Sequence, residues 1–457
     1  MRRYDQKRDT YAQPPYILGH WSTAIFLQLP NGVAGTSDRR HCLRVDEKTT
    51  NPSSCHTRRG AATIVRRLRR LGHNAFFVGG AVRDTLLNRP IREYDIATSA
   101  TPDQVIAAFR RTVPVGVQFG VVLVILDDGE YEVATFRAET SYSDGRHPDT
   151  VRFVSAREDV LRRDFTINGL LQDPDSGDIE DYVDGRADLQ ARLIRAIGEA
   201  DARFSEDHLR ILRAIRFATC LAFDIETDTF RAIIRLAHTV ADVAAERIQA
   251  ELRRTFTEGD AVRAFTLLSV SGVIQVIFPA LQGYRTAGTA QALVLAGNLC
   301  FAEALSLLLM EHPESRAIAL SASWSERLKL PKTDREHLRY LVANRTRPES
   351  INSQAARLRF IREAHFDSFA KIDMARRTAL KTSVAPLQKL VDLRATVNTQ
   401  ALHPTPLLTG RELKALGYRP GPHFKTMLLA LEDAQLERRV GSVEEAVELM
   451  KSIMPLE

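Results

Sequence analysis

Two carboxylates that follow a pair of glycines are the residues of this 457-residue chain best suited to chemistry. Glu93 and Asp95 stand two positions apart, and side chains at i and i+2 of a strand share a face, so both can bind one cation. Gly79 and Gly80 precede them, and glycine lets backbone N–H groups come close to a phosphate. A phosphate-binding turn beside paired carboxylates is what metal-assisted transfer of a nucleotidyl group requires.

The surrounding segments predict the elements that hold these residues. Residues 75–78 form an apolar run typical of a buried strand, and residues 81–87 form an amphipathic segment that predicts a helix ending before Pro90. The N-terminus of that helix points at the glycines, and helix N-termini attract anions. Glu93 and Asp95 are then expected on a second short strand, where two acidic side chains would also fit a solvated edge.

A helix and a hairpin are predicted next. Thr101 is a typical N-cap and Pro102 suits the first turn, which predicts a helix as far as about Arg111. Residues 121–126 and 130–135 read as two strands joined by an Asp-Asp-Gly turn. The second of these strands includes Glu132, whose carboxylate would also fit a paired position on an edge strand.

A second polar group begins at residue 162. Arg162 and Arg163 are adjacent, and with Asp164 they can bind a polyphosphate and a ribose hydroxyl together. The same charges would also fit a cluster of surface salt bridges. Their position at the end of a predicted loop leaves both interpretations open on residue type alone.

A third group lies on a predicted helix over residues 206–217. Its apolar positions mark one buried stripe: Leu209, Leu212, Ile215 and Phe217. Asp207 and Arg210 lie at i and i+3, so both can point into one cleft. A carboxylate acceptor beside a guanidinium donor can match the Watson–Crick edge of a base, and a salt bridge within the helix fits the same spacing.

These three groups resemble one known family. Residues 74–100 are similar to the signature of the DNA polymerase beta nucleotidyltransferase superfamily, and more narrowly to that of the bacterial tRNA nucleotidyltransferase (CCA-adding enzyme) and poly(A) polymerase family. Residues 162–168, RRDFTIN, match a motif of that family letter for letter, and residues 206–210, EDHLR, match the E-D-x-x-R motif of class II CCA-adding enzymes. The resemblance is strong over residues 60–255 and loose over 256–457.

The resemblance implies a site and its ligands. Catalytic carboxylates would be Glu93, Asp95 and Glu132, with Glu93 and Asp95 binding Mg²⁺ and Glu132 acting as a base or a further metal ligand. Nucleotide contacts would come from Gly79, Gly80, Arg83, Arg162, Arg163, Asp164, Asn168, Asp207, Arg210 and Arg213. The reaction would be attack of a tRNA 3′ hydroxyl on CTP or ATP, with release of pyrophosphate.

The chain departs from the family pattern at two positions. The family has Asp where this chain has Glu93, and the longer side chain moves the carboxylate oxygens in a site where Mg²⁺ demands near-ideal geometry. Asp184 replaces the first Gly of the D-x-x-G-G-x-x-D-L motif, in a turn that tolerates Asp. Residues 135–154 are polar and turn-rich, and resemble a flexible loop that the family needs to change from C to A addition and that enzymes adding only CC lack. Residues 245–252 resemble a structural helix that braces the base-reading one.

Composition places the chain among globular proteins. Apolar residues make up 44% and charged residues 26%, which is ordinary for a soluble domain. The net charge of +6 and a pI of about 9.2 suit a nucleic-acid partner without demanding one. Cysteines are scattered at positions 42, 55, 220 and 300, without a C-x-x-C pair, so a reducing cytoplasm is expected. The apolar stretch 292–310 contains Asn298 and Glu303 and predicts buried helices rather than a membrane span.

The family resemblance implies an α+β fold: a small mixed-sheet nucleotidyltransferase head followed by an all-α neck, body and tail. The expected divisions are a disordered extension over 1–57, a catalytic head over 58–195, a base-recognising neck over 196–260, and a tRNA-binding body and tail over 261–457. No histidine precedes an aspartate, which excludes the HD phosphohydrolase domain that some family members carry.

Three alternative functions stay open. A poly(A) polymerase would share every head motif, although the acidic, helical C-terminal end argues against it. An enzyme that adds only the terminal A would look nearly the same. A non-catalytic RNA-binding relative is the alternative of another class, and Glu93 is the feature that favours it.

Overall fold

The computed structural model describes residues 57–116, 120–140, 150–283 and 286–455. The predicted extension therefore falls, except for its last residue, outside the described residues, as does the centre of the 135–154 segment. Of the cysteines, Cys220 and Cys300 are free thiols, and the other two lie outside those ranges.

A mixed sheet forms the centre of the head. In the described ranges it has seven strands in the order β3-β4-β5-β2-β1-β8-β9. The strands are β1 (Ala75–Val78), β2 (Asp95–Thr98), β3 (Thr112–Gly116), β4 (Val121–Leu126), β5 (Gly129–Thr135), β8 (Leu170–Gln172) and β9 (Ile179–Asp181). β2 and β5 run parallel, and the other neighbours run antiparallel. The predicted strands over 75–78, 121–126 and 130–135 are confirmed.

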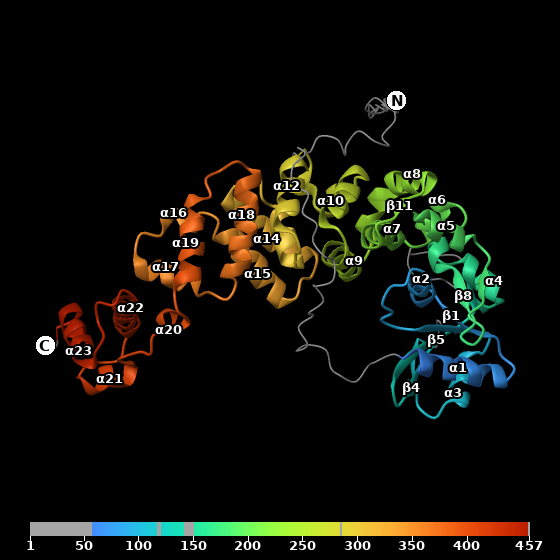
Figure 1. Ribbon diagram of the computed structural model, residues 1–457, viewed down its shortest axis with the longest axis horizontal. Coiled ribbons are helices and arrows are strands. Elements are labelled where there is room, and N and C mark those ends of the chain that lie inside the picture. The colour runs from blue at the N-terminus through green and yellow to red at the C-terminus, as the bar shows by residue number, and fades with distance from the viewer. Residues whose placement is uncertain (1–56, 117–119, 141–149, 284–285, 456–457) are drawn as a thin grey trace, which may run out of the picture. The chain divides into compact units, whose positions relative to one another are not determined.

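Apolar burial explains why these segments form the sheet. β5 alternates buried and exposed positions, with Tyr131 and Val133 in the core, as a half-buried strand should. α1 (Arg58–Arg70) packs on β1 and buries Ile64, Val65 and Leu68. The head helices and short elements are α2 (Gly80–Leu86), α3 (Pro102–Ala108), α4 (Ala156–Leu161), η2 (Thr166–Asn168), α5 (Gly185–Ala191) and β10 (Leu193–Ile194). Figure 1 shows α1 and α3 beside the strands β4 and β5 of this sheet.

Three sequence predictions for the head need correction. β2 begins at Asp95, so Glu93 precedes the strand instead of lying on it. α3 begins at the predicted cap, where Thr101 and Gln104 form a capping box, but it ends at Ala108 instead of Arg111. The 135–154 segment was predicted as a loop, whereas its two ends form an antiparallel pair, β6 (Arg137–Thr140) and β7 (Thr150–Phe153).

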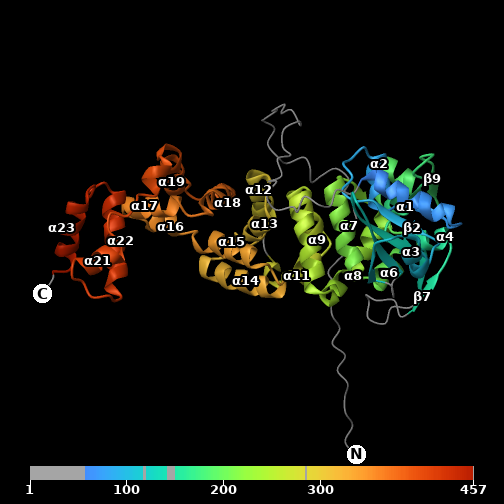
Figure 2. The same ribbon diagram turned by 90° about the horizontal axis from the view of Figure 1, so that it is seen from below.

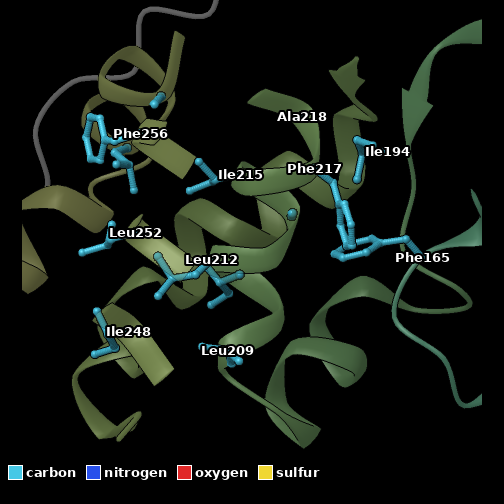
Figure 3. Packing of buried hydrophobic residues seen from close by; sticks show 14 of the residues in the cluster. Phe165, Ile194, Leu209, Leu212, Ile215, Phe217, Ala218, Ile248, Leu252 and Phe256 are labelled. Atoms are coloured by element: carbon cyan, nitrogen blue, oxygen red, sulfur yellow. The ribbon is translucent and has the colours of Figure 1, made fainter. Parts of the chain in front are cut away.

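The neck is built around α7 (Leu209–Leu221), which packs against α9 (Ala245–Glu258). Figure 3 shows Leu209, Leu212 and Ile215 on the same helix, with Leu212 and Ile215 facing the α9 side chains Ile248, Leu252 and Phe256. The predicted stripe of residues 209, 212, 215 and 217 is buried, as expected. Phe217 makes an edge-to-face contact with Phe165 of the head, with ring centroids 5.7 Å apart, so one apolar core joins the two parts.

The helix predicted over 206–217 is broken. α6 (Ala200–Glu206) ends before Asp207, which has an extended backbone, and α7 starts at Leu209. The Asp207 carboxylate accepts a hydrogen bond from the backbone N–H of Leu209 at 3.1 Å. Short acidic side chains that bond nearby backbone groups in this way favour helix starts over helix interiors, which explains the break.

From about residue 220 onward the described chain is almost entirely helical, as predicted. The elements up to residue 361 are β11 (Asp224–Ile225), α8 (Thr227–Leu236), η3 (Ala237–Asp242), α10 (Ala261–Val270), α11 (Val273–Ile277), η4 (Pro279–Leu281), α12 (Thr286–Ala296), α13 (Phe301–Leu308), α14 (Glu314–Arg327), α15 (Lys332–Ala343), α16 (Arg347–Ser350) and α17 (Gln354–Ile361). Those after it are α18 (Phe366–Ala379), α19 (Ala385–Thr396), α20 (Thr399–Leu402), α21 (Gly410–Ala415), α22 (His423–Leu436) and α23 (Val443–Ile453). Figure 2 shows this order from the green neck to the red C-terminal helices.

The apolar stretch 292–310 falls on α12 and α13, whose side chains are largely buried. None of the helices in the described ranges has both the length and the apolar character to cross a bilayer. The expectation of buried helices at this point is confirmed.

The turn before α5 generates a stability prediction. A Cβ added at Gly185 would lie deep inside van der Waals contact with the carbonyl oxygen of Thr166. Gly185→Ala must therefore push α5 away from the η2 turn, and we expect a loss of about 1–3 kcal/mol in the free energy of unfolding. Urea unfolding followed by tryptophan fluorescence and circular dichroism measures it.

Arg186→Ala is the matched control, because Arg186 is the exposed next residue of α5. Its effect should stay within about 0.5 kcal/mol. Equal stability of the two variants would contradict the packing described for this turn.

Candidate active site

One cavity of about 510 Å³ lies between the head sheet and α7. It is lined by every residue that sequence analysis assigned to catalysis, metal binding or nucleotide binding: Gly79, Gly80, Arg83, Glu93, Asp95, Glu132, Arg162, Arg163, Asp164, Asn168, Asp207, Arg210 and Arg213. Residues separated by as much as 134 positions therefore meet in one place. Their individual roles stay predictions.

The glycine turn connects β1 to α2 in a conformation that suits glycine. Gly79 has φ +66° and ψ −131°, a region that other residues adopt only with strain. A Cβ added there would lie 3.6 Å from both Arg163 Nη1 and Asp95 Oδ2. The turn is thus flanked by a guanidinium on one side and a predicted metal ligand on the other.

The three predicted catalytic carboxylates face one another across β2 and β5. Ile96 pairs with Val133 in the parallel ladder, so the preceding residues, Asp95 and Glu132, occupy neighbouring positions. Burial, followed by the negative charges of Glu93 and Glu132, raises the pKa of Asp95 to about 6, against the lowering effect of Arg163. Burial and Glu93 also raise the pKa of Glu132. β5 lies between β4 and β2, so the alternative of an edge-strand Glu132 is wrong.

These carboxylates have the chemistry of a site for a hard cation. Mg²⁺ prefers oxygen ligands and commonly uses one or two carboxylates together with water and substrate phosphates. Like charges that raise one another's pKa are relieved by a cation placed between them. In the described ranges no cluster of three or more His, Cys, Asp or Glu side chains forms a ready-made metal site. Independently of that, the carboxylates that line the cavity fit an ion that takes its remaining ligands from water and substrate phosphates.

Asp164 is the centre of a network that links head and neck. Its Oδ1 accepts from the N–H of Phe165 at 2.8 Å and from Asn168 Nδ2 at 3.1 Å. Its Oδ2 accepts two bonds from Arg213 of α7, at 2.9 and 2.7 Å. Burial raises the pKa of the Asp164 carboxyl, but the Arg213 charge and these hydrogen bonds outweigh it and lower the pKa to about 2. Both oxygens are thus engaged in holding protein groups.

The network continues on both sides. Arg83 of α2 donates to Asn168 Oδ1 at 2.8 Å. Glu251 of α9 lies 3.7 Å from Arg213 and accepts from Arg216 at 2.5 Å. Sequence analysis described the 245–252 segment only as a brace, and missed Glu251 as an ionic partner. The spacing of residues within α9 contains no signal for it, because the contact depends on how α9 packs on α7.

Asp207 and Arg210 both line the cavity, but they have different partners. Arg247 of α9 donates to Asp207 at 2.9 and 3.3 Å. Arg210 donates to Glu206 at 2.6 Å and to the carbonyl oxygen of Arg162 at 3.1 Å. The alternative of an intrahelical salt bridge between Asp207 and Arg210 is therefore wrong, since Asp207 lies outside α7 and both charges are engaged elsewhere.

Sequence analysis missed several further groups at this site. Asp159 accepts hydrogen bonds from both Arg162 and Arg163, and its spacing of three and four residues from them on a helix was a usable signal. Three further arginines that line the cavity were also missed: Arg137, Arg216 and Arg254. Nothing in their local sequence separates them from the many other arginines of the chain.

Comparison with known proteins identifies the family. Residues 75–195 match the family described as the poly A polymerase head domain, and residues 222–284 match the probable RNA and SrmB-binding site of polymerase A. The CCA-adding enzyme of Streptococcus thermophilus is 33% identical over 85% of this chain and 94% of that enzyme. The chain belongs to the CCA-adding enzyme family.

Other members of the family extend the likeness. The CCA-adding enzyme of Geobacillus thermodenitrificans is 47% identical to this chain over the matched region. That region covers 47% of this chain and 53%, about half, of that enzyme. The crystal structure of the Bacillus stearothermophilus CCA-adding enzyme in complex with CTP superposes with a TM-score of 0.66 at 30% identity, over 86% of this chain and 97% of that one. The predicted α+β fold is confirmed. Members of this family generally use a divalent metal ion.

The low pKa of Asp164 generates a prediction of pH-dependent stability. The carboxyl titrates near 3.8 when unfolded and at about 2 when folded, so the ion pair stabilises the fold above about pH 4 and this contribution is lost as the pH falls toward 2. We expect Asp164→Asn to lower the free energy of unfolding by about 2 kcal/mol between about pH 5 and 7. Below about pH 4 the difference from the wild type should shrink.

Urea unfolding at a series of pH values measures this difference. Asp178→Asn, at an exposed carboxylate of the same head, should change stability by less than about 0.5 kcal/mol throughout. A difference between Asp164→Asn and the wild type that stays constant down to about pH 3 would contradict the assignment.

Proposed function

We propose that this chain is a tRNA nucleotidyltransferase that adds C and A to the 3′ end of tRNA from CTP and ATP, with Mg²⁺ and release of pyrophosphate. The observation that carries the proposal is that three sets of residues line one cavity. A glycine turn and two arginines suit a triphosphate, three carboxylates adjoin them, and an Asp–Arg pair suits a base. The full-length similarity to a CCA-adding enzyme supports the same substrates.

The carboxylate end of the cavity supplies the chemistry. Glu93 and Asp95 would hold the Mg²⁺, and a bound ion would supply stabilisation of negative charge on the α-phosphate oxygens and on the departing pyrophosphate. Glu132 stands beside Asp95, where it can accept the proton of the attacking 3′ hydroxyl or bind the ion. Glu93 is an exposed residue of the loop before β2. From there its longer side chain reaches the cavity, which it lines.

The arginine end holds and selects the nucleotide. Arg162 and Arg163 present guanidinium groups that suit phosphate oxygens, and Arg163 Nη1 lies at the glycine turn. Asp207 and Arg210 offer an acceptor and a donor to the edge of a base. Because Arg210 also donates to the backbone of Arg162, the base-reading and phosphate-binding groups are held at a fixed separation.

The domain layout follows from these roles. We infer a catalytic head over residues 58–195, a base-selecting neck over 196–260, and a tRNA-binding body and tail over 261–457, with the reaction in the cytoplasm. The match to the head-domain family ends at residue 195, which supports the first boundary.

A poly(A) polymerase is the second candidate function. The family matched over 75–195 is described as the poly A polymerase head domain, so the head alone suits either activity. The full-length relative favours CCA addition. The segment over 135–154, which the sequence resemblance connects with the change from C to A addition, lies partly outside the described residues.

Removing one predicted metal ligand tests the chemistry. Asp95→Asn should reduce nucleotide transfer to tRNA by roughly 100-fold or more, because the loss of a carboxylate ligand removes charge stabilisation from the transition state. Binding of tRNA and the thermal midpoint should change little, since Asn has nearly the same volume.

Glu130→Gln is the matched control for Asp95→Asn. Glu130 lies on β5 two residues before Glu132, is exposed, and is absent from the cavity lining. Transfer by this variant should equal that of the wild type. Near-normal turnover by Asp95→Asn would mean that the metal site has been misplaced.

Base selection is tested at Arg210. Arg210→Ala should reduce discrimination against UTP and GTP by about 1–3 kcal/mol, because a mismatched base would no longer leave the Arg210 donors unpaired. Arg163→Ala should instead weaken all four nucleotides about equally, since every nucleotide has the same triphosphate. Competition assays with one tRNA substrate distinguish the two patterns.

Arg203→Ala is the control for Arg210→Ala. Arg203 donates to the same Glu206 carboxylate at 2.9 Å but does not line the cavity. Selectivity should be unchanged in this variant. If Arg210→Ala weakens every nucleotide uniformly, base selection has to come from other residues.

A further inference from the structure

One buried carboxylate lies behind the two arginines of the cavity. Asp159 is on α4, three and four residues before Arg162 and Arg163, and its side chain is 2% exposed. The arginine side chains are 20% and 18% exposed and line the cavity, whereas Asp159 does not. Asp159 therefore cannot touch a nucleotide and can act only through its partners.

Both oxygens of Asp159 are fully used by these partners. Oδ1 accepts from Arg162 Nε and Nη2 at 3.0 and 2.6 Å, and from the backbone N–H of Arg137 at 3.2 Å. Oδ2 accepts from Arg163 Nε and Nη2 at 3.3 and 3.0 Å. Burial raises the pKa of this carboxyl, but the charges of Arg163 and Arg162 outweigh it and hold the pKa below its usual value.

The geometry determines what each arginine presents to the cavity. Each guanidinium uses its Nε and Nη2 edge for Asp159, so its Nη1 corner points elsewhere. Arg163 Nη1 lies beside the Gly79 turn. The backbone of Arg162 in turn accepts the hydrogen bond from Arg210. One carboxylate thus fixes the position of two cations at the predicted phosphate end and supports the predicted base reader.

We propose that Asp159 is the positioning residue of the triphosphate site: it orients Arg162 and Arg163 and so sets the affinity for the phosphate chain without contacting it. The inference rests on the proposed function, because it takes the two arginines as the phosphate ligands. It predicts an effect on phosphate binding that is the same for every base.

The body of the chain contains a matched control. Asp373 of α18 is likewise 2% exposed at its side chain, and it accepts hydrogen bonds from Arg376 and Arg377, again three and four residues on. Both distances are 2.6 Å. The same D-x-x-R-R arrangement therefore occurs once at the cavity and once on α18, where none of its three residues lines the cavity. A variant at each position separates local positioning from general loss of stability.

The experiment compares Asp159→Asn with Asp373→Asn in the full chain by equilibrium binding of inorganic tripolyphosphate, CTP, ATP and UTP. The Asn amide places an NH₂ donor against a guanidinium donor, so at least one arginine loses its fixed orientation. Asp159→Asn should weaken binding of all four ligands by about tenfold. Asp373→Asn should bind them as the wild type does, even where both variants lower the thermal midpoint.

Asp159→Glu provides a second test, because it keeps the charge and should recover part of the tripolyphosphate affinity. Unchanged binding by Asp159→Asn, equal weakening by Asp373→Asn, or weakening confined to one base would each overturn the proposal. If the wild type binds nucleotides as expected but transfers none to tRNA, the proposed function fails while the positioning role stands. If Asp159→Asn does not fold, the comparison of Asp159→Glu with the wild type decides. Weakened affinity of Asp159→Glu for tripolyphosphate, combined with wild-type affinity for CTP, would then contradict the positioning role of Asp159.

Discussion

The ion pair between Asp164 and Arg213 is the interaction on which the rest of the site depends. It joins the turn after α4, in the head, to α7, the central helix of the neck. Asp164 is nearly buried, and Arg213 is partly exposed where it lines the cavity. Breaking such a pair leaves an uncompensated charge, which costs far more than the pair contributes when intact. The same carboxylate holds Asn168, which accepts from Arg83, while Arg213 lies against Glu251 of α9. The apolar contact of Phe165 with Phe217 reinforces the connection.

This connection explains how one cavity can combine two tasks. Phosphate chemistry needs clustered charges of both signs, and these come from β2, β5 and the end of α4. Base selection needs donors and acceptors held at a constant distance from that chemistry. Arg210, whose guanidinium contacts both Glu206 and the Arg162 backbone, supplies this fixed relation. Under the proposed function, contacts between protein groups would therefore set the separation between the reacting phosphorus and the recognised base.

Much of this arrangement could be predicted from the sequence, because its signals are local. The strand at Ala75–Val78, the Gly79 turn and the capped helix at Thr101 follow from hydrophobic pattern and turn chemistry. Contacts set by packing could not be predicted. The break at Asp207 depends on a side chain capping the next helix, and the pairing of Asp207 with Arg247 depends on how α9 lies on α7. Glu93 was misplaced because residues 92–95, Arg-Glu-Tyr-Asp, show no alternation of apolar and polar side chains that would mark where the strand begins.

The proposed activity of this chain is the addition of a defined C and A sequence to the end of tRNA. The direct measurement incubates the purified chain with Mg²⁺ and a tRNA that lacks its last three, two or one nucleotides. Each tRNA is tested with CTP, with ATP, with both, and with UTP and GTP. The reaction products are then sequenced. We expect that each truncated tRNA is restored to CCA and extended no further, that UTP and GTP are refused, and that a tRNA already ending in CCA is left unchanged. Long runs of A on any RNA 3′ end, or no transfer to any tRNA, would contradict it.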